Sequence, residues 1–460
     1  MDDKFDLIVR KGTCVLPGRA LAAADIGIRN GRIEAVGALG SAKAEHTFDA
    51  MGLHVLPGVI DTQVHFREPG LEHKEDLATG SAAAAMGGVT AFFEMPNTSP
   101  HKLDRAKGRS WTDHAFFIGG SAGNAHRLHE LEKLPGCSGV KVFMGSSTGD
   151  LLAEDDETLE AILSNGIRRV AIHAEDEPRL RERFELVRGG ADVEMHPVWR
   201  DAETAVLATK RILALAKKTG RRVHVLHITT GDEMELLKDA KDYATVECTP
   251  QHLTLTAPDC YRELGSLAQM NPPIRDASHR DRLWRALAEG VVDVIGSDHA
   301  PHTLEEKAGE YPASPSGMPG VQTLVPIMLD HVAAGRLTLQ RFVDLTSAGP
   351  QRIYNIAGKG RIARGYDADL TIVDLKAERT ISNDWVASKC GWTPFDGRKV
   401  RGWPMATVIR GNVVMRACRS AGPVPGRLKP GPSEFGVTGP GQAGTVRPFC
   451  TAGRARQRSR

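Results

Sequence analysis

The sequence predicts an α/β protein in which an eight-stranded (β/α)8 TIM-type barrel is joined to a small β-sandwich domain formed by both termini. Three observations support this fold class. The chain has 460 residues, roughly three times the length of a typical ~150-residue domain. Its middle alternates short apolar, β-branched runs with stretches of helical periodicity. Both ends are instead rich in strand patterns and turn residues.

The two ends of the chain are expected to form the β-sandwich domain together. Residues 25–37 alternate apolar and polar positions around Asn30-Gly31, which is a strong hairpin signal. Residues 367–375 have the pattern of a strand, and residues 406–416 that of a hairpin turning at Gly411-Asn412. The sequence therefore predicts a β-sandwich domain from residues 1–54 and 358–420, with the barrel at 55–357.

The middle of the chain contains eight apolar runs of strand length. They lie at 55–60, 89–95, 115–119, 140–144, 170–173, 223–228, 245–249 and 291–296. Helical spacing separates most of them, as at 201–216 and 280–288. Apolar strands alternating with helices indicate a parallel sheet covered on its faces, and eight such units fit a barrel. The alternative, a doubly wound sheet, lacks its glycine-rich phosphate loop here.

Composition excludes several classes of protein. Hydrophobic residues make up 41% and aromatic residues only 5%, and the net charge is +2, so neither a nucleic-acid nor a membrane partner is expected. The last 40 residues, 421–460, carry about +6 and many Gly and Pro, which predicts a flexible basic tail. Seven cysteines without a C-x-x-C motif, and no signal or membrane segment, predict a cytoplasmic protein.

Polar residues gather where the predicted barrel strands end, which is where barrel enzymes carry their active sites. Imidazoles together with a carboxylate are the ligands that zinc-like metals prefer. The candidates are Gln63, His65, Arg67, Asn97, Lys141, His173, His227, Asp298 and His302. Other histidines, including His196 and His252, are expected to be ordinary core or surface residues. His224 should face the opposite way from His227 on the same strand.

Lys141 is unusual because an ammonium group inside a barrel is costly unless it is paired or modified. One interpretation is a salt bridge to an inward-facing acid. The other is carbamylation by CO2, which would make the side chain an anionic ligand able to bridge two metals. The residues themselves leave both open.

At these residues the sequence resembles the amidohydrolase superfamily, and within it the dihydroorotase group of cyclic-amide hydrolases. The resemblance rests on residues 58–70 (GVIDTQVHFREPG), 87–90 (GGVT), 95–98 (MPNT), 271–275 (NPPIR), 297–302 (SDHAPH), 317–320 (GMPG), 365–370 (GYDADL) and 393–397 (TPFDG). Together the motifs span about residues 5–416. They imply metal-dependent interconversion of N-carbamoyl-L-aspartate and (S)-dihydroorotate in pyrimidine biosynthesis.

The resemblance also implies roles for individual residues. The implied metal ligands are Gln63, His65, Lys141, His173, His227 and Asp298, holding one or two Zn2+ ions. Asp298 would also be the general acid and base. Arg67, Asn97 and His302 would bind the carboxylate of a small anionic substrate, and Asn271 its ring amide. The Ser316-Gly317 backbone would close the pocket. Family members commonly form homo-oligomers, so a dimer or tetramer is expected.

Gln63 departs from the family pattern, which has histidine at this position of its His-x-His motif. A carboxamide oxygen is a weaker zinc ligand than imidazole. The resulting hypotheses are a working enzyme with a modified or single-metal site, an enzyme of altered substrate preference, and a partly decayed homologue. An allantoinase or hydantoinase-like enzyme is an alternative favoured by Lys141 and its Val-Phe-Met surroundings, and a non-catalytic subunit that supports aspartate transcarbamoylase is an alternative favoured by Gln63 alone. The intact acid/base and carboxylate-binding set favours a working enzyme.

Overall fold

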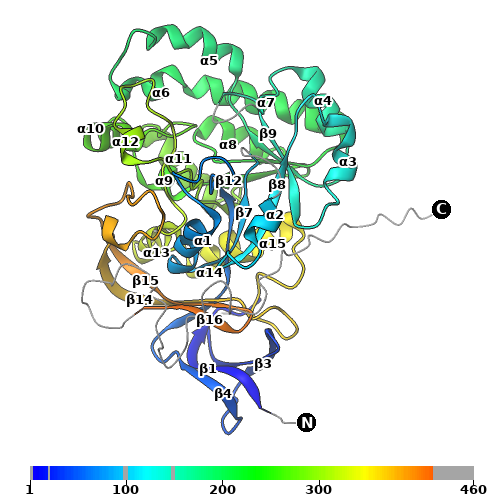
Figure 1. The fold of residues 1–460 in the computed structure, drawn as a ribbon, viewed down its shortest axis with the longest axis vertical. Helices are drawn as coiled ribbons and strands as arrows, with labels where there is room; N and C mark the ends of the chain where they lie inside the picture. The colour runs from blue at the N-terminus through cyan, green and yellow to red at the C-terminus, as the bar shows by residue number, and fades with distance from the viewer. Residues whose placement is uncertain (1–3, 19–20, 97–101, 147–150, 418–460) are drawn as a thin grey trace, which may run out of the picture.

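The computed structural model describes residues 4–18, 21–96, 102–146 and 151–417. Its strands form two separate eight-stranded sheets. One is a parallel barrel surrounded by helices, and the other combines strands from both ends of the chain (Figure 1). The predicted fold class is thereby confirmed. The predicted tail at 421–460 lies outside the described residues.

The barrel strands follow one another in chain order around the sheet. They are β6 (Val59–Val64), β7 (Val89–Glu94), β8 (Asp113–Gly119), β9 (Cys137–Phe143), β10 (Val170–His173), β11 (Val223–Val225), β12 (Ala244–Cys248) and β13 (Val294–Ile295). Every neighbouring pair is parallel. A parallel bridge between Val64 and His299 brings the last segment back to the first strand. All eight carboxyl ends therefore meet at one rim.

The run at 55–60, expected as one strand, is divided between the two sheets. β5 (His54–Pro57) pairs with β1 and β14 of the terminal sheet, whereas β6 opens the barrel. The change occurs at Gly58, where an added Cβ would lie 2.3 Å from Thr90 Oγ1. A continuous apolar run conceals this boundary, because both of its halves are buried.

Helices cover the outside of the barrel. The longer ones are α1 (Leu77–Met86), α4 (Asp156–Ser164), α7 (Ala202–Thr219), α8 (Gly231–Lys238), α11 (Ala277–Ala288) and α13 (Leu324–Ala333). Shorter ones are α2 (Lys102–Ala106), α3 (Leu128–Leu131), α5 (Glu177–Arg183), α6 (His196–Trp199), α9 (Pro250–Thr254), α10 (Asp259–Leu264), α12 (Leu304–Lys307), α14 (Leu339–Val343) and α15 (Gly349–Tyr354). The helices expected at 201–216 and 280–288 are α7 and α11. Asp201 and Asp276 cap their N-termini.

The second sheet joins both ends of the chain, as predicted for the β-sandwich domain. Its strands are β1 (Phe5–Cys14), β2 (Ala22–Arg29), β3 (Arg32–Gly37), β4 (Ala44–Asp49), β5, β14 (Leu370–Thr380), β15 (Lys399–Ile409) and β16 (Asn412–Arg416). The hairpin at Asn30-Gly31 is present, with positive φ at both residues. The second hairpin turns at Arg410-Gly411, one residue before the expected position.

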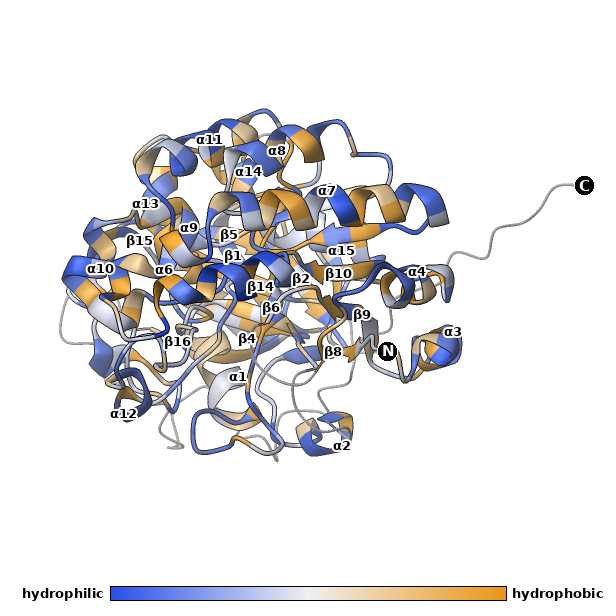
Figure 2. Ribbon diagram, turned by 90° about the horizontal axis from the view of Figure 1, so that it is seen from above, coloured by the Kyte–Doolittle hydropathy of each residue, from blue (hydrophilic) through white to orange (hydrophobic). Residues whose placement is uncertain are grey.

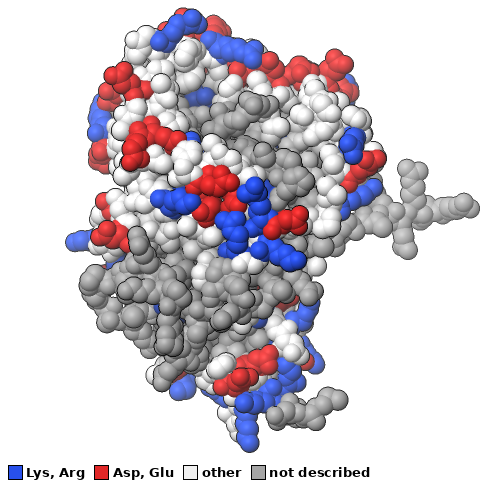
Figure 3. Space-filling model, viewed as in Figure 1, with Lys and Arg blue, Asp and Glu red and all other residues white. Residues whose placement is uncertain are grey.

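The two largest clusters of buried residues each belong to one of the two sheets. Branched apolar side chains fill the layer between barrel and helices, and a second cluster fills the terminal sheet. In Figure 2, hydrophobic and hydrophilic residues alternate along α7, as expected for a helix with one buried face. Acidic and basic side chains are interspersed on the face seen in Figure 3. Among the described residues, no helix has the length and apolarity of a membrane span.

Candidate active site

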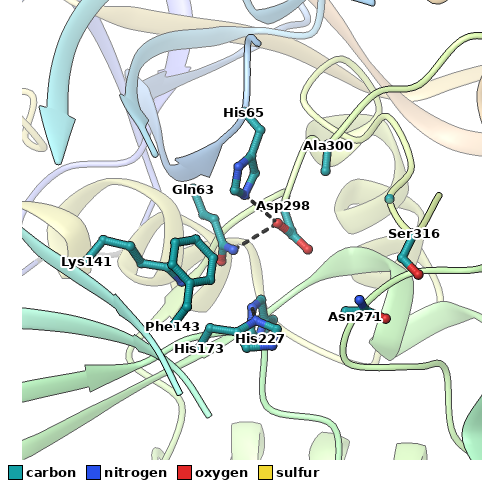
Figure 4. A pocket seen from close by; sticks show the side chains of 11 residues that line it. Gln63, His65, Lys141, Phe143, His173, His227, Asn271, Asp298, Ala300 and Ser316 are labelled. Carbon is teal, nitrogen blue, oxygen red and sulfur yellow. Dashed lines mark hydrogen bonds and ion pairs between the residues drawn. The ribbon is translucent and has the colours of Figure 1, made fainter. Parts of the chain in front are cut away.

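A pocket lies at the rim formed by the carboxyl ends of the barrel strands. It comprises about 330 Å³ of space not filled by atoms, part of which is open to solvent. Its lining comprises Gln63, His65, Lys141, Phe143, His173, His227, Asn271, Asp298, Ala300, Ser316 and Gly317 (Figure 4). The structure thus brings all the predicted metal-binding residues together with Asn271, Ser316 and Gly317. Asn97 lies outside the described residues.

Unusual backbone geometry occurs at two residues of the pocket lining, His227 and Asp298, and at Arg67 outside the lining. Arg67, His227 and Asp298 adopt φ values of 62°, 36° and 45°, which are unfavourable for residues other than glycine and are typical of functional sites. The sequence predicted that His224 and His227 face opposite ways. This prediction is wrong, because the backbone of His227 does not have strand geometry. Strand β11 ends at Val225, so the alternation of faces does not extend to His227. His224 also lies inside the barrel, where its Nδ1 is 2.8 Å from Thr245 Oγ1.

His173 and His227 form one group of potential metal ligands. His173 Nδ1 lies 3.1 Å from His227 Nε2. Two nitrogens that bind one zinc ion at ~2.0–2.1 Å with tetrahedral angles are about 3.3 Å apart. On the other side of its ring, His173 Nε2 lies 2.9 Å from Glu175 Oε2, and Arg200 Nε donates to Glu175 Oε1 at 3.0 Å. Burial lowers the pKa of both histidines, which favours the neutral, ligating imidazole.

His65 and Asp298 form a second group, joined by Gln63. His65 Nε2 lies 3.3 Å from Asp298 Oδ1, and Gln63 Nε2 donates to the same oxygen at 2.9 Å (Figure 4). Gln63 Oε1 is buried without a hydrogen-bond partner among the described residues. In this geometry Gln63 orients the Asp298 carboxylate, and its own oxygen remains available as a ligand.

Lys141 lies between these groups and is fully buried. Its Nζ has no hydrogen-bond partner among the described residues and sits 4.4 Å from the centre of the Phe143 ring. No described carboxylate lies within salt-bridge distance of it, so the salt-bridge interpretation is not supported by this geometry. Desolvation lowers the pKa of Lys141 to about 7, although Asp298 and Glu247 oppose the shift.

Arg67 and His302 do not line the pocket but lie directly behind its wall. Arg67 Nε donates to Pro301 O at 3.1 Å, and Nη2 lies 3.2 Å from His302 Nε2. His302 Nε2 in turn lies 3.0 Å from the backbone oxygen of Ser316, a pocket residue. Arg67 is only 2% exposed, yet no described carboxylate pairs with it within 4 Å.

An acidic group at Asp113, Asp367 and Asp369 superficially resembles a metal site. Three cations offset its three charges: Lys359 Nζ makes ion pairs with all three carboxylates, Arg410 binds Asp113, and Arg32 lies 3.8 Å from Asp367. Asp113 begins β8 at the amino end of a barrel strand, opposite the pocket. This group therefore links the base of the barrel to the terminal sheet.

Sequence reasoning missed the residues that support the site. Glu175 could have been found, because it lies two residues after His173 and strand parity places both on one face. Arg200 and His196 belong to a long connection between β10 and α7. No local pattern in the sequence indicates that this connection returns to the pocket.

Comparisons with known proteins agree with this geometry. The model of the amidohydrolase family matches residues 54–414. A dihydroorotase of Methanosarcina mazei is 35% identical over 91% of this chain and 96% of its own length, and one of Halobacterium salinarum is 36% identical over 85% and 93%. Among solved structures, an L-hydantoinase (dihydropyrimidinase) of Arthrobacter aurescens has a TM-score of 0.85 at 30% identity, covering 90% of this chain and 96% of its own. This chain belongs to the amidohydrolase family.

Proposed function

We propose that this protein is a dihydroorotase, which interconverts N-carbamoyl-L-aspartate and (S)-dihydroorotate. The curated relatives at 35–36% identity carry that name. The observation that carries the proposal is the buried Arg67 guanidinium without a carboxylate partner in the described chain. A buried, unpaired cation is costly unless an anionic ligand compensates it. Dihydroorotate has such a carboxylate, whereas hydantoin and dihydrouracil rings are neutral.

The ligand set fits one or two Zn2+ ions. His173 and His227 would hold one ion, and His65 and Asp298 the other, with Gln63 as a weak additional ligand. The buried Lys141 Nζ has no hydrogen-bond partner among the described residues, and as a carbamate it would supply a further anionic ligand. When bound, zinc supplies Lewis acidity, which activates water and polarises a carbonyl group.

The chain's own residues would bind the substrate and move the proton. Arg67 and the neutral His302 hold the substrate carboxylate, and Asn271 contacts the ring. In hydrolysis, Asp298 accepts a proton from the attacking water and delivers it to the ring nitrogen as the amide C–N bond breaks. In the reverse direction, Asp298 takes the proton from the ureido nitrogen as that bond forms and water leaves.

A substrate panel tests the proposal. The purified, zinc-loaded protein should turn over dihydroorotate faster than allantoin, hydantoin or dihydrouracil. Arg67→Gln removes about two charge-assisted hydrogen bonds and should lower kcat/KM for dihydroorotate by roughly 10²–10³-fold. Turnover of dihydrouracil, which lacks the carboxylate, should change little in the same variant. Arg67→Lys is the matched control, since it keeps the positive charge but loses the planar guanidinium that can donate two parallel hydrogen bonds to a carboxylate.

A hydantoinase-like activity is the second candidate, supported by the structural likeness to L-hydantoinase and dihydropyrimidinase. Rapid cleavage of a neutral ring with no turnover of dihydroorotate would establish the hydantoinase-like activity and reject the dihydroorotase proposal. The third candidate, a non-catalytic subunit supporting aspartate transcarbamoylase, depends on Gln63 alone. It predicts a chain that binds almost no zinc and stays inactive after reconstitution.

The remaining expectations concern the state of the protein in the cell. A homodimer or homotetramer should appear in sedimentation of the purified protein. The five described cysteines form no disulfide, which fits a reducing, cytoplasmic compartment. Thiol counting on freshly isolated protein tests that location indirectly, since disulfides would argue against it.

A further inference from the structure

We infer that His196 is a positioning residue that fixes the side-chain amide of Asn271, so that Asn271 presents its N–H groups to a ring carbonyl of the substrate. The inference rests on the proposed function for the identity of the substrate. It assigns a role to a histidine that the sequence pattern treats as an ordinary core residue.

His196 begins helix α6 and is completely buried. Its Nε2 lies 3.0 Å from the backbone oxygen of Met270 and 3.1 Å from Oδ1 of Asn271. On the opposite side of the ring, Nδ1 lies 3.3 Å from the hydroxyl of Tyr311, which is also buried. Both ring nitrogens therefore have a defined partner.

The partners of His196 determine which nitrogen carries its proton. The Met270 carbonyl can only accept a hydrogen bond, so Nε2 must be protonated and donate. Nδ1 is then the acceptor, and the Tyr311 hydroxyl donates to it. Burial and the nearby Arg200 lower the pKa of His196 to about 3, so the imidazole is neutral at working pH.

This tautomer fixes the orientation of Asn271. If the amide were flipped, Nδ2 would face the Nε2–H group, and two donors would oppose each other at 3.1 Å. Oδ1 must therefore face His196, and Nδ2 must face away from it. Asn271 lines the pocket, and Figure 4 shows its amide nitrogen on the side of Asp298. In the described part of the chain, Nδ2 donates to no other group.

The arrangement selects for the chemistry of the ligand at that position. A ring carbonyl satisfies the Nδ2 donor, whereas a ring N–H would leave two donors facing each other in a largely buried site. An unsatisfied polar pair of this kind discriminates strongly between substrates. Asn271 thus selects a substrate with a hydrogen-bond acceptor at this position, and His196 holds the Asn271 amide in the orientation that makes this selection.

The tautomer can be measured independently of any activity. In zinc-loaded protein labelled with 15N-histidine, the signals lost in His196→Gln identify His196. We expect one protonated nitrogen and one unprotonated nitrogen, with the proton on Nε2. A proton on Nδ1, or a doubly protonated ring at neutral pH, would overturn the inference whatever the substrate is. Tyr311→Phe should weaken this preference without removing the Met270 hydrogen bond.

A double-mutant cycle tests the action through Asn271. His196→Leu should raise KM for dihydroorotate about tenfold with kcat little changed, since one neutral hydrogen bond to bound substrate is lost. His196→Gln, which retains an N–H donor, should recover most of the affinity. In an Asn271→Ala background, His196→Leu should have no further effect on KM. An equal rise in both backgrounds, or no rise in either, would refute the positioning role.

The controls separate this inference from the proposed function. Zinc content of each variant should match the parent protein within error, whereas the melting temperature of His196→Leu should fall, because the Met270 carbonyl and the Tyr311 hydroxyl lose their buried hydrogen-bond partner. If His196→Leu does not fold, the tautomer of the parent protein and the KM of Tyr311→Phe decide the question. If the parent protein does not turn over dihydroorotate, the proposed function fails, and the tautomer measurement still tests the role of His196.

Discussion

Lys141 should react with CO2 far more readily than an ordinary lysine, because burial keeps its amine neutral. Its pKa is lowered to about 7 by desolvation. At pH 8 about 90% of such a side chain is the neutral amine, against roughly 0.3% for a lysine of ordinary pKa. The nucleophilic fraction is therefore raised roughly 300-fold. Carbamylation joins the Nζ lone pair to the carbon of CO2 and releases one proton.

The pH dependence follows from the direction of this shift. Below pH 7 the folded Lys141 is mostly the ammonium form, which has no lone pair to attack CO2. The neutral fraction at pH 6 is about one-tenth, so carbamylation of metal-free protein should fall roughly tenfold between pH 8 and pH 6. Protein loaded with zinc at pH 8 and then acidified should lose the modification more slowly, since the metal would hold the carbamate.

The assay is 13C NMR of protein incubated with 13C-labelled bicarbonate and zinc. A single carbamate resonance is expected in the parent protein and should be absent from Lys141→Met. Lys307 provides a matched control, because it is also buried and its pKa is also lowered to about 7. Its Nζ donates to three backbone oxygens, of Gln269, Pro315 and Gly317, so Lys307→Met should keep the signal. An undiminished resonance in Lys141→Met would refute the reasoning.

Four further changes test other parts of the site. Gln63→His should raise the zinc content per chain, measured by elemental analysis; unchanged content would mean that position 63 does not contact metal. Glu175→Gln should weaken zinc binding about 10–100-fold in a chelator competition, because it loses the carboxylate behind His173. Asp298→Asn should lower kcat by about 10²–10⁴-fold with only a small change in KM. Lys359→Met should lower the free energy of unfolding in urea by about 3–5 kcal/mol, since it removes the ion pair of the buried Asp369 carboxylate and leaves Asp113 with Arg410 alone.

The ligand positions could be predicted because barrel topology brings the ends of all parallel strands to one rim. Gln63, His65, His173 and Asp298 needed only their places at strand ends. His227 was identified for the same reason. The direction of His224 was predicted wrongly, because the positive φ at His227 interrupts the alternation of faces. No propensity rule predicts a strained residue of this kind, since it is maintained by the surrounding fold.

Other features depend on contacts between distant segments, which a single sequence does not contain. The run at 55–60 divides at Gly58, where Thr90 from the neighbouring strand approaches so closely that a side chain would not fit. The role of His196 depends on Met270 and Tyr311, which lie 74 and 115 positions away along the chain. In each case the sequence contains the residues, but only the three-dimensional arrangement defines what they do.

The distribution of charge around His302 explains how a body of negative net charge can bind an anion. Residues 1–420 carry about −4. Burial lowers the pKa of His302, and the nearby Arg67, Lys74 and Lys307 lower it further, while the Glu306 carboxylate lies 3.6 Å from its Nδ1 and pairs with Lys74 at 3.0 Å. His302 is therefore neutral, and Lys74 Nζ lies 3.1 Å from its Nδ1. Beyond a Debye length of about 8 Å, salt screens the charges of the distant surface. Because Glu306 offsets Lys74, Arg67 is the main local charge near His302 without a described carboxylate partner. An anionic substrate there experiences mainly this guanidinium, and the net charge of the chain has little influence on its binding.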